Sequence, residues 1–222
     1  MKKVFFLLNK LDEFNFQILL NKYLPNASIS IGESLPSCTD DFDLIILWSY
    51  RKIIKHIKNN MMVFHSSDLP NGKGWAPIYN SFAQELSYYT ISGIILSDKI
   101  DSGDIVVKAR FKVKNNYTAT FIRQWDSEIS ILLISSILNK FTNKEIIGQK
   151  QENEGSFYSR RVANDNEIDT KQSFTDIIAH LRGCEHSHPA FFFHKDSKYY
   201  ISIQPEIEPQ LPSDIEIFFD KA

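Results

Sequence analysis

Residues 61–70 read Met-Met-Val-Phe-His-Ser-Ser-Asp-Leu-Pro, and this stretch decides the fold. Its first four residues form a continuous apolar run, which is typical of a strand buried in a parallel sheet. The run ends at His65. In open α/β sheets, ligands bind outside the carboxyl ends of the strands. The stretch therefore predicts an α/β fold in which His65 stands at the functional edge of the sheet.

Similar apolar runs on both sides of this strand predict a Rossmann-like sheet that is open, mostly parallel and covered by helices. Further strands are expected over residues 4–8, 27–31, 42–48, 88–96 and 105–113. Helices are expected over residues 14–20, 50–57, 75–86 and 118–141. In the last helix, apolar residues recur at helical spacing, and Asp126, Glu128 and Lys140 are expected on the opposite face, away from the sheet.

The last third of the chain predicts a small appendage. The polar residues 149–156 are typical of a linker. Beyond them the sequence predicts one helix near residues 173–181 and a β-hairpin across residues 191–203. We therefore expect a main domain over residues 1–148, followed by a linker and a small C-terminal α+β extension over residues 149–222.

Composition argues against several classes of protein. Lys and Arg number 25 and Asp and Glu number 27, so the net charge is −2. The chain lacks the overall basic field that holds nucleic acid. The apolar run at the start stops at Asn9, too early for a signal peptide, and no segment approaches the roughly 20 apolar residues of a membrane span. We expect a cytoplasmic protein that binds neither nucleic acid nor a membrane.

A metal site is not expected either. Cys38 and Cys184 form neither a disulfide framework nor a metal-ligand spacing. His186 and His188 alone do not complete a tetrahedral site. The chemistry expected of this chain therefore depends on its own acids, bases and backbone groups.

His65 is followed by the loop Asn-Gly-Lys-Gly-Trp over residues 71–75, and then by Asp101 on the turn Asp-Ser-Gly-Asp. A histidine, an acid and a flexible loop are parts from which acyl-transfer chemistry can be built. Each also has a structural interpretation: a hydrogen-bonded strand end for His65, a turn pair for Asp101 and Asp104, and glycines that supply positive φ before a helix. We expect Asp104 to have the turn role and Asp101 the chemical role.

Four motifs in this order resemble the folate-dependent formyltransferases. Three of them are residues 65–70 with Lys73-Gly74 following, residues 101–105, and residues 158–161 leading to residues 167–169. The fourth, residues 181–183 with residues 189–192, is most similar to the branch that modifies sugars. The resemblance extends over residues 42–203 and implies the formyltransferase fold.

The resemblance implies transfer of a formyl group from N10-formyltetrahydrofolate to a primary amine, through an intermediate whose oxygen becomes negative. In the family, a histidine and an asparagine two positions before it face this oxygen, and an aspartate pairs with the histidine and assists proton removal. His65 and Asp101 match two of these. The asparagine position holds Val63, which has no donor, and loss of one such donor costs on the order of 10²–10³ in rate. Asn60 and Asn80 are candidate substitutes by residue type.

The resemblance also implies which residues bind the two substrates. The residues expected to bind the folate cofactor are Trp48, Ser49, Tyr50, Asp98 and Ile100. The residues expected to bind the acceptor are Lys73, Gly74 and Trp75. Lys73 stands where the family has arginine, and the Trp75 ring offers a flat face for a sugar or base.

The sugar-like C-terminal motif implies an amino sugar as the acceptor, carried on a nucleotide. Two alternatives stay open: a formyltransferase for another small amine or aminoacyl acceptor, and a catalytically silent formyltransferase-like binding module, which Val63 favours. Dimers are common in the sugar branch. Aromatic residues of the expected hairpin, such as Tyr199 and Tyr200, predict an interface for a homodimer.

Overall fold

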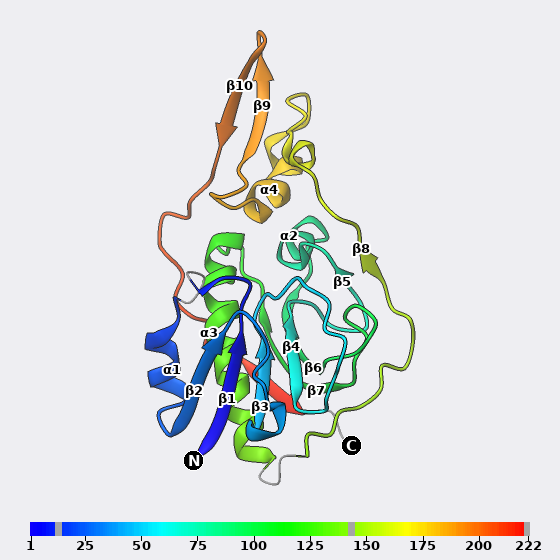
Figure 1. Cartoon of the computed structure of the whole chain (residues 1–222). Coiled ribbons are helices and arrows are strands. Elements are labelled where there is room, and N and C mark those ends of the chain that lie inside the picture. The colour runs from blue at the N-terminus through cyan, green and yellow to red at the C-terminus, as the bar shows by residue number, and fades with distance from the viewer. Residues whose placement is uncertain (12–14, 142–144, 220–222) are drawn as a thin grey trace.

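A computed structural model describes residues 1–11, 15–141 and 145–219 (Figure 1). At its centre lies a seven-stranded sheet. In spatial order the strands are β11 (Glu216–Phe219), β7 (Ile105–Lys112), β6 (Tyr88–Ile95), β4 (Met61–His65), β3 (Leu44–Leu47), β1 (Lys2–Leu7) and β2 (Ala27–Gly32). The strands expected from the sequence are present, with small shifts at their ends, and β11 is an addition that the sequence did not predict.

The sheet is mixed but mostly parallel. β2, β1, β3 and β4 pair in parallel, whereas β6 pairs antiparallel with β4, β7 with β6, and β11 with β7. β1, β2, β3, β4 and β7 therefore share one direction, which confirms the predicted α/β fold class. Because β1, β3 and β4 are parallel, their carboxyl ends meet at one edge of the sheet, and His65 is the last residue of β4.

Helices α1 (Gln17–Tyr23) and α3 (Ala119–Lys140) pack on one face of the sheet (Figure 1). α3 confirms the predicted long helix. Its apolar stripe is buried, and the ring of Trp125 meets the rings of Tyr117 and Phe111 at centroid distances of 4.8 and 6.2 Å. This packing holds α3 along the sheet, with residues 123–130 beside the carboxyl ends of β1 and β3.

The opposite face of the parallel strands is covered by irregular chain. Tyr50 and Ile54 pack there against a cluster formed by β1, β3 and the start of β4. The helix predicted over residues 50–57 is therefore wrong, because this segment has no helical turn. Arg51 and Lys55 stand four residues apart, with Lys52 and Lys58 close by, so a helix would bring like charges together. The β-branched isoleucines between them also disfavour a helix.

Two other predicted helices are shifted or shortened. The helix expected over residues 75–86 is α2 (Pro77–Ala83). It starts late because Ala76 takes a left-handed conformation and Pro77 fits the first helical position. The helix expected over residues 14–20 corresponds to α1, which runs three residues further along the chain, and Phe14 lies outside the described residues.

The C-terminal part contains the predicted helix and hairpin. β8 (Phe157–Tyr158) pairs with β5 (Lys73–Gly74). η3 (Ala163–Asn166) is a short 3-10 helix, and α4 (Phe174–Gly183) packs against α2. A similar 3-10 helix, η2 (Thr39–Asp41), lies earlier in the chain, between β2 and β3. β9 (Ala190–His194) and β10 (Ser197–Ile201) form a hairpin that projects from the body (Figure 1). The chain then returns to the sheet as β11, so residues 149–222 contribute both the extension and one edge of the main sheet.

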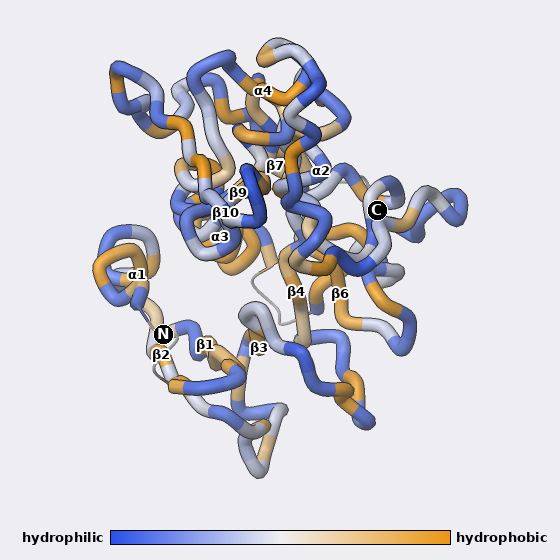
Figure 2. Tube along the Cα trace, turned by 90° about the horizontal axis from the view of Figure 1, so that it is seen from above, coloured by the Kyte–Doolittle hydropathy of each residue, from blue (hydrophilic) through white to orange (hydrophobic). Residues whose placement is uncertain are grey.

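The apolar residues gather in the middle of the molecule. Figure 2 looks down on it, with the hydrophobic stretches of β1, β3, β4 and β6 inside and hydrophilic loops around them. Within the described ranges, no helix has both the length and the apolar character needed to cross a bilayer.

Candidate functional site

His65 and Asp101 lie together at the carboxyl end of β4. The Nδ1 atom of His65 is 3.5 Å from Oδ2 of Asp101, and the two side chains are 10% and 16% exposed. The Nε2 atom of His65 donates to the carbonyl oxygen of Gly72 at 2.8 Å. Both ring nitrogens thus face acceptors, so a protonated ring can donate from both. The structure brings the two predicted catalytic residues together.

The turn that carries Asp101 is held in place by several contacts. Asp101 has a positive φ of 50°, and its carbonyl oxygen accepts a hydrogen bond from Nε2 of Gln151, which also donates to Gly103. Gly103 lies so close to β6 that an added Cβ would fall 1.7 Å from the carbonyl oxygen of Ile95. The turn therefore fixes the Asp101 carboxylate beside His65.

The predicted acceptor-binding loop is joined directly to this pair. The amide of Gly74 donates to Oδ2 of Asp101 at 2.8 Å, the same oxygen that faces His65. The buried Lys73 ammonium lies 3.3 Å from Oγ of Ser102. Trp75 is half exposed, and the Arg160 guanidinium lies 5.0 Å from the centre of its ring. Gly74 thus contacts Asp101 directly and Lys73 contacts the same turn, whereas Trp75 meets Arg160.

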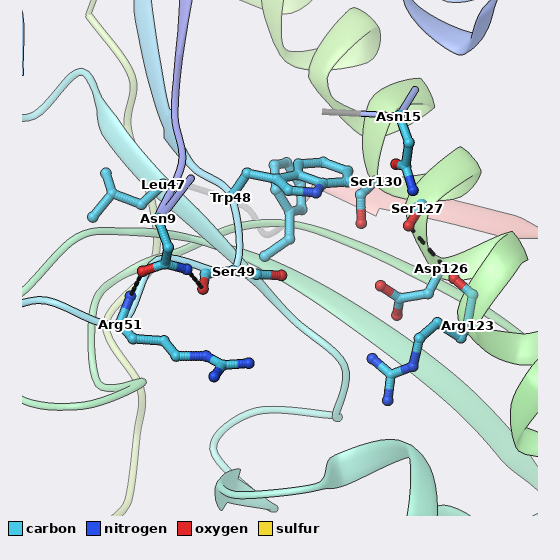
Figure 3. A pocket seen from close by; sticks show the side chains of 11 residues that line it. Asn9, Asn15, Leu47, Trp48, Ser49, Arg51, Arg123, Asp126, Ser127 and Ser130 are labelled. Carbon is cyan, nitrogen blue, oxygen red and sulfur yellow. Dashed lines mark hydrogen bonds between the residues drawn. The ribbon is translucent and has the colours of Figure 1, made fainter. Parts of the chain in front are cut away.

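A cavity of about 310 Å³ opens on the other side of β4, at the carboxyl ends of β1 and β3 (Figure 3). By strand alternation, Phe64 faces α3 and His65 faces the opposite side. Phe64 lines this cavity together with Trp48, Ser49, Arg51 and Asp126, whereas His65 does not. The cavity and the His65–Asp101 pair thus share β4 but lie on its two sides.

The five predicted cofactor-binding residues do not share one cavity. Trp48 and Ser49 line the cavity of Figure 3, and the Trp48 ring packs against Phe16 at 4.5 Å. Tyr50 packs on the opposite face of the sheet. Asp98 and Ile100 are exposed on the turn next to Asp101. Trp48 and Ser49 therefore lie beside α3, whereas Asp98 and Ile100 lie beside Asp101.

Asp126 is the residue of this region that the sequence interpretation missed. It was expected on the solvent face of its helix, but its carboxylate points into the cavity (Figure 3) and accepts a hydrogen bond from the buried Tyr89 hydroxyl at 2.5 Å. Glu128, by contrast, turns away to Tyr23 and Lys22. The sequence contains a signal for the inward position of Asp126, because this residue lies four residues after Ile122 and four before Ser130, in phase with the buried stripe.

Burial sets the protonation behaviour of this acid. It raises the pKa of Asp126 above its ordinary value, against the lowering effects of Tyr89, Ser66, Arg123 and His65. Burial and the Asp126 charge also raise the pKa of Tyr89 well above its ordinary value. Tyr89 therefore stays protonated and acts as the donor. His65 is close enough to influence Asp126 although the two lie on different sides of β4.

The two asparagines considered as substitutes for the missing donor are both used elsewhere. Asn60 precedes β4, at the opposite end from His65, and its amide donates to the carbonyls of Thr39 and Phe42. The amide of Asn80 donates to the carbonyls of Trp75 and Ala76. Both suggestions are wrong, and Val63 itself packs among apolar side chains.

Potential metal ligands are scattered in the part of the chain that the structure describes. Within residues 1–11, 15–141 and 145–219, no three His, Cys, Asp or Glu side chains converge as a metal site would require. The absence of a resident metal stays a prediction.

The sequence of this chain is similar to those of curated methionyl-tRNA formyltransferases. No protein-family model matches the chain. It is 28% identical over 192 residues to the methionyl-tRNA formyltransferase of Pelagibacter ubique, which covers 80% of this chain and 61% of that protein. The chain thus spans less than two thirds of the length of this curated relative.

Solved structures show the same fold. The methionyl-tRNA formyltransferase of Clostridium thermocellum superposes with a TM-score of 0.73 at 23% identity, covering 99% of this chain and 100% of that chain. A sugar N-formyltransferase from Shewanella superposes with a TM-score of 0.65 at 14% identity, covering 94% and 100%. The chain therefore has the fold of the formyltransferases, and its sequence is similar to that of a methionyl-tRNA formyltransferase.

Proposed function

We propose that this chain is a folate-dependent N-formyltransferase that moves a formyl group from N10-formyltetrahydrofolate to the primary amine of a nucleotide-linked amino sugar. The observation that carries the proposal is the His65–Asp101 pair, with 3.5 Å between Nδ1 and Oδ2 at the carboxyl edge of a sheet of the formyltransferase fold. The sugar acceptor is supported by the C-terminal motif of residues 181–183 and 189–192.

In this proposal each residue of the pair has a separate task. Nε2 of His65 exchanges its bond to the Gly72 carbonyl for one to the oxygen of the formyl group as negative charge develops there, which is the contribution expected of an oxyanion-stabilising group. Asp101 orients the ring and receives a proton from the attacking amine. Val63 lacks the hydrogen-bond donor of the family's asparagine. The buried Lys73 ammonium, close to Ser102, compensates for this loss with its positive charge.

The residues beside Asp101 fit a folate. Ile100 is 68% exposed and offers an apolar contact next to the catalytic acid. Asp98 on the same turn is exposed and accepts hydrogen bonds from N–H groups such as those of a pterin ring. N10-formyltetrahydrofolate would supply the formyl carbon, and we assign Asp98, Ile100 and Tyr50 to its side of the site.

Formation of product tests this function. The protein is incubated with N10-formyltetrahydrofolate and a panel of primary amines that includes nucleotide-linked amino sugars, free amino sugars and aminoacyl amides. Mass spectrometry of the amines and absorbance of released tetrahydrofolate are followed together. We expect a formylated amino sugar and stoichiometric tetrahydrofolate. Absence of any formylated amine contradicts the proposal.

Two other functions have an observation in their favour. Similarity to a methionyl-tRNA formyltransferase favours an aminoacyl acceptor, and the aminoacyl amides of the panel would then be formylated instead. The bond from His65 Nε2 to Gly72, together with Val63, favours a silent binding module. Such a module would bind tetrahydrofolate without any His65-dependent loss of the formyl group.

Location and assembly complete the proposal. We place the enzyme in the cytoplasm, acting on a small molecule and not on nucleic acid. A homodimer would use the hairpin of β9 and β10, where Phe193, Tyr199 and Tyr200 are 52%, 48% and 65% exposed. Light scattering of the wild type and of Tyr200→Ser distinguishes the two states, since the variant should be a monomer if the hairpin forms the interface.

A further inference from the structure

Residues 149–158, most of which the sequence predicts as a linker, cross from the turn of Asp101 to the loop beside His65. At the start of this segment, Gln149 forms an antiparallel bridge with Ile105, the first residue of β7, through two backbone bonds of 2.8 Å. At its end, β8 pairs with β5 (Figure 1). The segment is therefore attached to the main domain at both ends, and we call residues 149–158 the strap.

The side chain of Gln151 connects the strap to the Asp101 turn. Its Nε2 atom donates to the carbonyl oxygens of Asp101 and Gly103, each at 2.9 Å. Carbonyl oxygens only accept hydrogen bonds, so the end of the side chain that faces the turn must be a donor. An amide nitrogen meets this requirement, whereas an ionised carboxylate of the same shape does not.

Ser156 connects the strap to the loop on the other side of the pair. Its Oγ atom accepts a hydrogen bond from the amide of Gly72 at 2.9 Å. Its carbonyl oxygen accepts one from the amide of Lys73 at 3.0 Å. The peptide group between Gly72 and Lys73 is thus held from two directions, because its carbonyl oxygen accepts the bond from Nε2 of His65.

Close packing fixes the distance between the strap and this loop. Gly155 has a φ of +67°, and an added Cβ would lie 1.8 Å from the carbonyl oxygen of Pro70. At Gly72, whose φ is +75°, an added Cβ would lie 2.7 Å from the ring of Tyr158. Only glycine allows the two backbones to approach so closely. The strap therefore has little freedom to move relative to the loop.

The two parts that the strap holds meet at one oxygen atom. The Gly74 amide of the loop donates to Oδ2 of Asp101, and the same oxygen faces Nδ1 of His65. A shift of the turn or of the loop therefore changes the distance between the carboxylate and the imidazole. A displacement of about 1 Å among reacting groups is enough to lower a rate about a hundredfold.

We propose that the strap positions this pair for formyl transfer, with Gln151 holding the Asp101 turn and Ser156 holding the loop beside His65. The proposal rests on the proposed function and deepens it. Gln151 and Ser156 are positioning residues, since their bonds engage backbone groups of the turn and the loop. Changes in them should lower kcat and leave the KM for the amine unchanged.

Gln151→Glu tests the donor that the turn requires. The new side chain keeps the shape of glutamine, but when it is ionised it has only acceptors to present to two carbonyl oxygens. Asn153→Asp is the matched control in the same strap. Asn153 accepts a hydrogen bond from the amide of Gly155 through its own oxygen, Oδ1, so an aspartate keeps this bond. Gln151→Met removes the donor without adding a charge.

The kcat of each variant is measured per folded molecule between about pH 8 and about pH 5. We expect Gln151→Glu to lower kcat about tenfold at the upper limit, with the KM for the amine within about twofold of the wild type. Its kcat relative to the wild type should rise as the pH falls, because a protonated carboxyl regains a donor. Gln151→Met should show a similar loss that does not vary with pH.

Asn153→Asp should match the wild type throughout this range. Three outcomes would overturn the proposal: an equal loss in Asn153→Asp, a kcat of Gln151→Met equal to that of the wild type, or a loss in Gln151→Glu that is the same at every pH. A rise in KM with an unchanged kcat would also overturn it, since such a change indicates a residue that binds the substrate.

Amide hydrogen exchange, resolved by NMR, separates this proposal from the proposed function. The Gly74 amide reports on the position of the turn relative to the loop, whether or not any amine is formylated. Its exchange should be at least about tenfold faster in Gln151→Glu than in Asn153→Asp, and the Gly72 amide should exchange faster in Ser156→Ala than in the wild type. If these rates change but no amine is formylated, the proposed function fails and positioning by the strap is supported. Unchanged exchange of both amides overturns the proposal.

Discussion

β4 ends in two residues that face opposite sides of the sheet, and the two sides are built differently. On one side, His65 packs against Asp101 and the loop of residues 72–74, and backbone groups engage both side chains. On the other side, Phe64 borders a cavity of about 310 Å³ into which Asp126 points (Figure 3). The first side is fixed before any ligand arrives, whereas the second is open.

In the proposed function, the two sides of β4 have different tasks. Groups that stabilise developing charge work best when they are already oriented, because they need not reorganise during the reaction. Groups that recognise a substrate need access from solvent. Changes on the His65 side should therefore affect turnover, whereas changes on the Asp126 side should affect ligand binding more than turnover.

The largest effect is expected for His65→Ala. This variant removes the group that we propose donates to the formyl oxygen, so turnover should fall by at least about a hundredfold. Mass spectrometry of the formylated amine measures the rate, and far-ultraviolet circular dichroism checks the fold. His56→Ala, an exposed histidine in the preceding loop, is the control and should be as active as the wild type. Similar activity of both variants would remove His65 from the chemistry.

A smaller effect is expected for Gly74→Ala. Gly74 has a φ of +93°, and an added Cβ would lie 2.6 Å from the carbonyl oxygen of Tyr158. The loop must shift, which weakens the bond from the Gly74 amide to Asp101 and costs about 1–3 kcal/mol of stability. We expect turnover about tenfold lower, measured per folded molecule after thermal unfolding. Full activity would show that this bond does not position Asp101.

Gly32→Ala is the control for Gly74→Ala. Gly32 lies at the end of β2, where an added Cβ meets the ring of Phe5 at 2.8 Å. This variant should lose stability but keep its activity per folded molecule. A loss of turnover as large as that of Gly74→Ala would mean that general destabilisation, and not the loop, controls the rate.

Val63→Asn also tests the His65 side of β4, and its effect on turnover should be smaller than that of Gly74→Ala. It introduces a donor two residues before His65 on the same face of β4, and it buries a polar group among apolar side chains at a cost of about 1–3 kcal/mol. We expect a lower melting temperature but a higher turnover per folded molecule. Val63→Ile adds no donor and should stay within about twofold of the wild type. If both substitutions change turnover equally, Val63 has no part in catalysis.

The smallest effects concern stability and pH. Because the folded pKa of Asp126 is raised above 3.8, the free energy of unfolding falls as the pH rises from 3.8 through the raised value. Asp126→Asn should thus be at least as stable as the wild type at pH 7. The pKa of Glu128 is lowered from 4.5, with burial opposing Lys22 and Tyr23, so its contribution is present above pH 4.5 and is lost in acid.

Thermal unfolding between pH 3 and pH 7 tests this contrast. Glu128→Gln should be less stable than the wild type at pH 7, and the difference should disappear in acid. Asp126→Asn should show the opposite trend. A loss of stability in Asp126→Asn as large as that in Glu128→Gln would identify Asp126 as a structural residue.

Much of the His65 side could be predicted from the sequence. Residues 61–64 form an unbroken apolar run, which is typical of a strand that is buried on both faces. The glycine of Asp-Ser-Gly-Asp predicts the turn, and the resemblance to the formyltransferases singles out Asp101 on it. These features are local, so the sequence contains enough information to find them.

The Asp126 side depends on tertiary structure. The direction of a side chain at the margin of a helical stripe follows from packing that the sequence pattern does not specify, and Tyr89, which holds Asp126, is 37 residues away. Tyr50 and Ile54 pack against the sheet although residues 50–57 form no helix. β11 pairs with β7 from more than a hundred residues away. These features arise from long-range contacts, which periodicity does not reveal.

The joint role of His65 and Asp101 is tested most directly by a double-mutant cycle on the two residues. Formyl transfer to the amine is measured in single turnovers for the wild type, His65→Ala, Asp101→Asn and the double variant. If the two residues act as a unit, the double variant should lose about as much rate as His65→Ala alone. Fully additive losses, or single variants as fast as the wild type, would contradict the claim that His65 and Asp101 together carry the transfer.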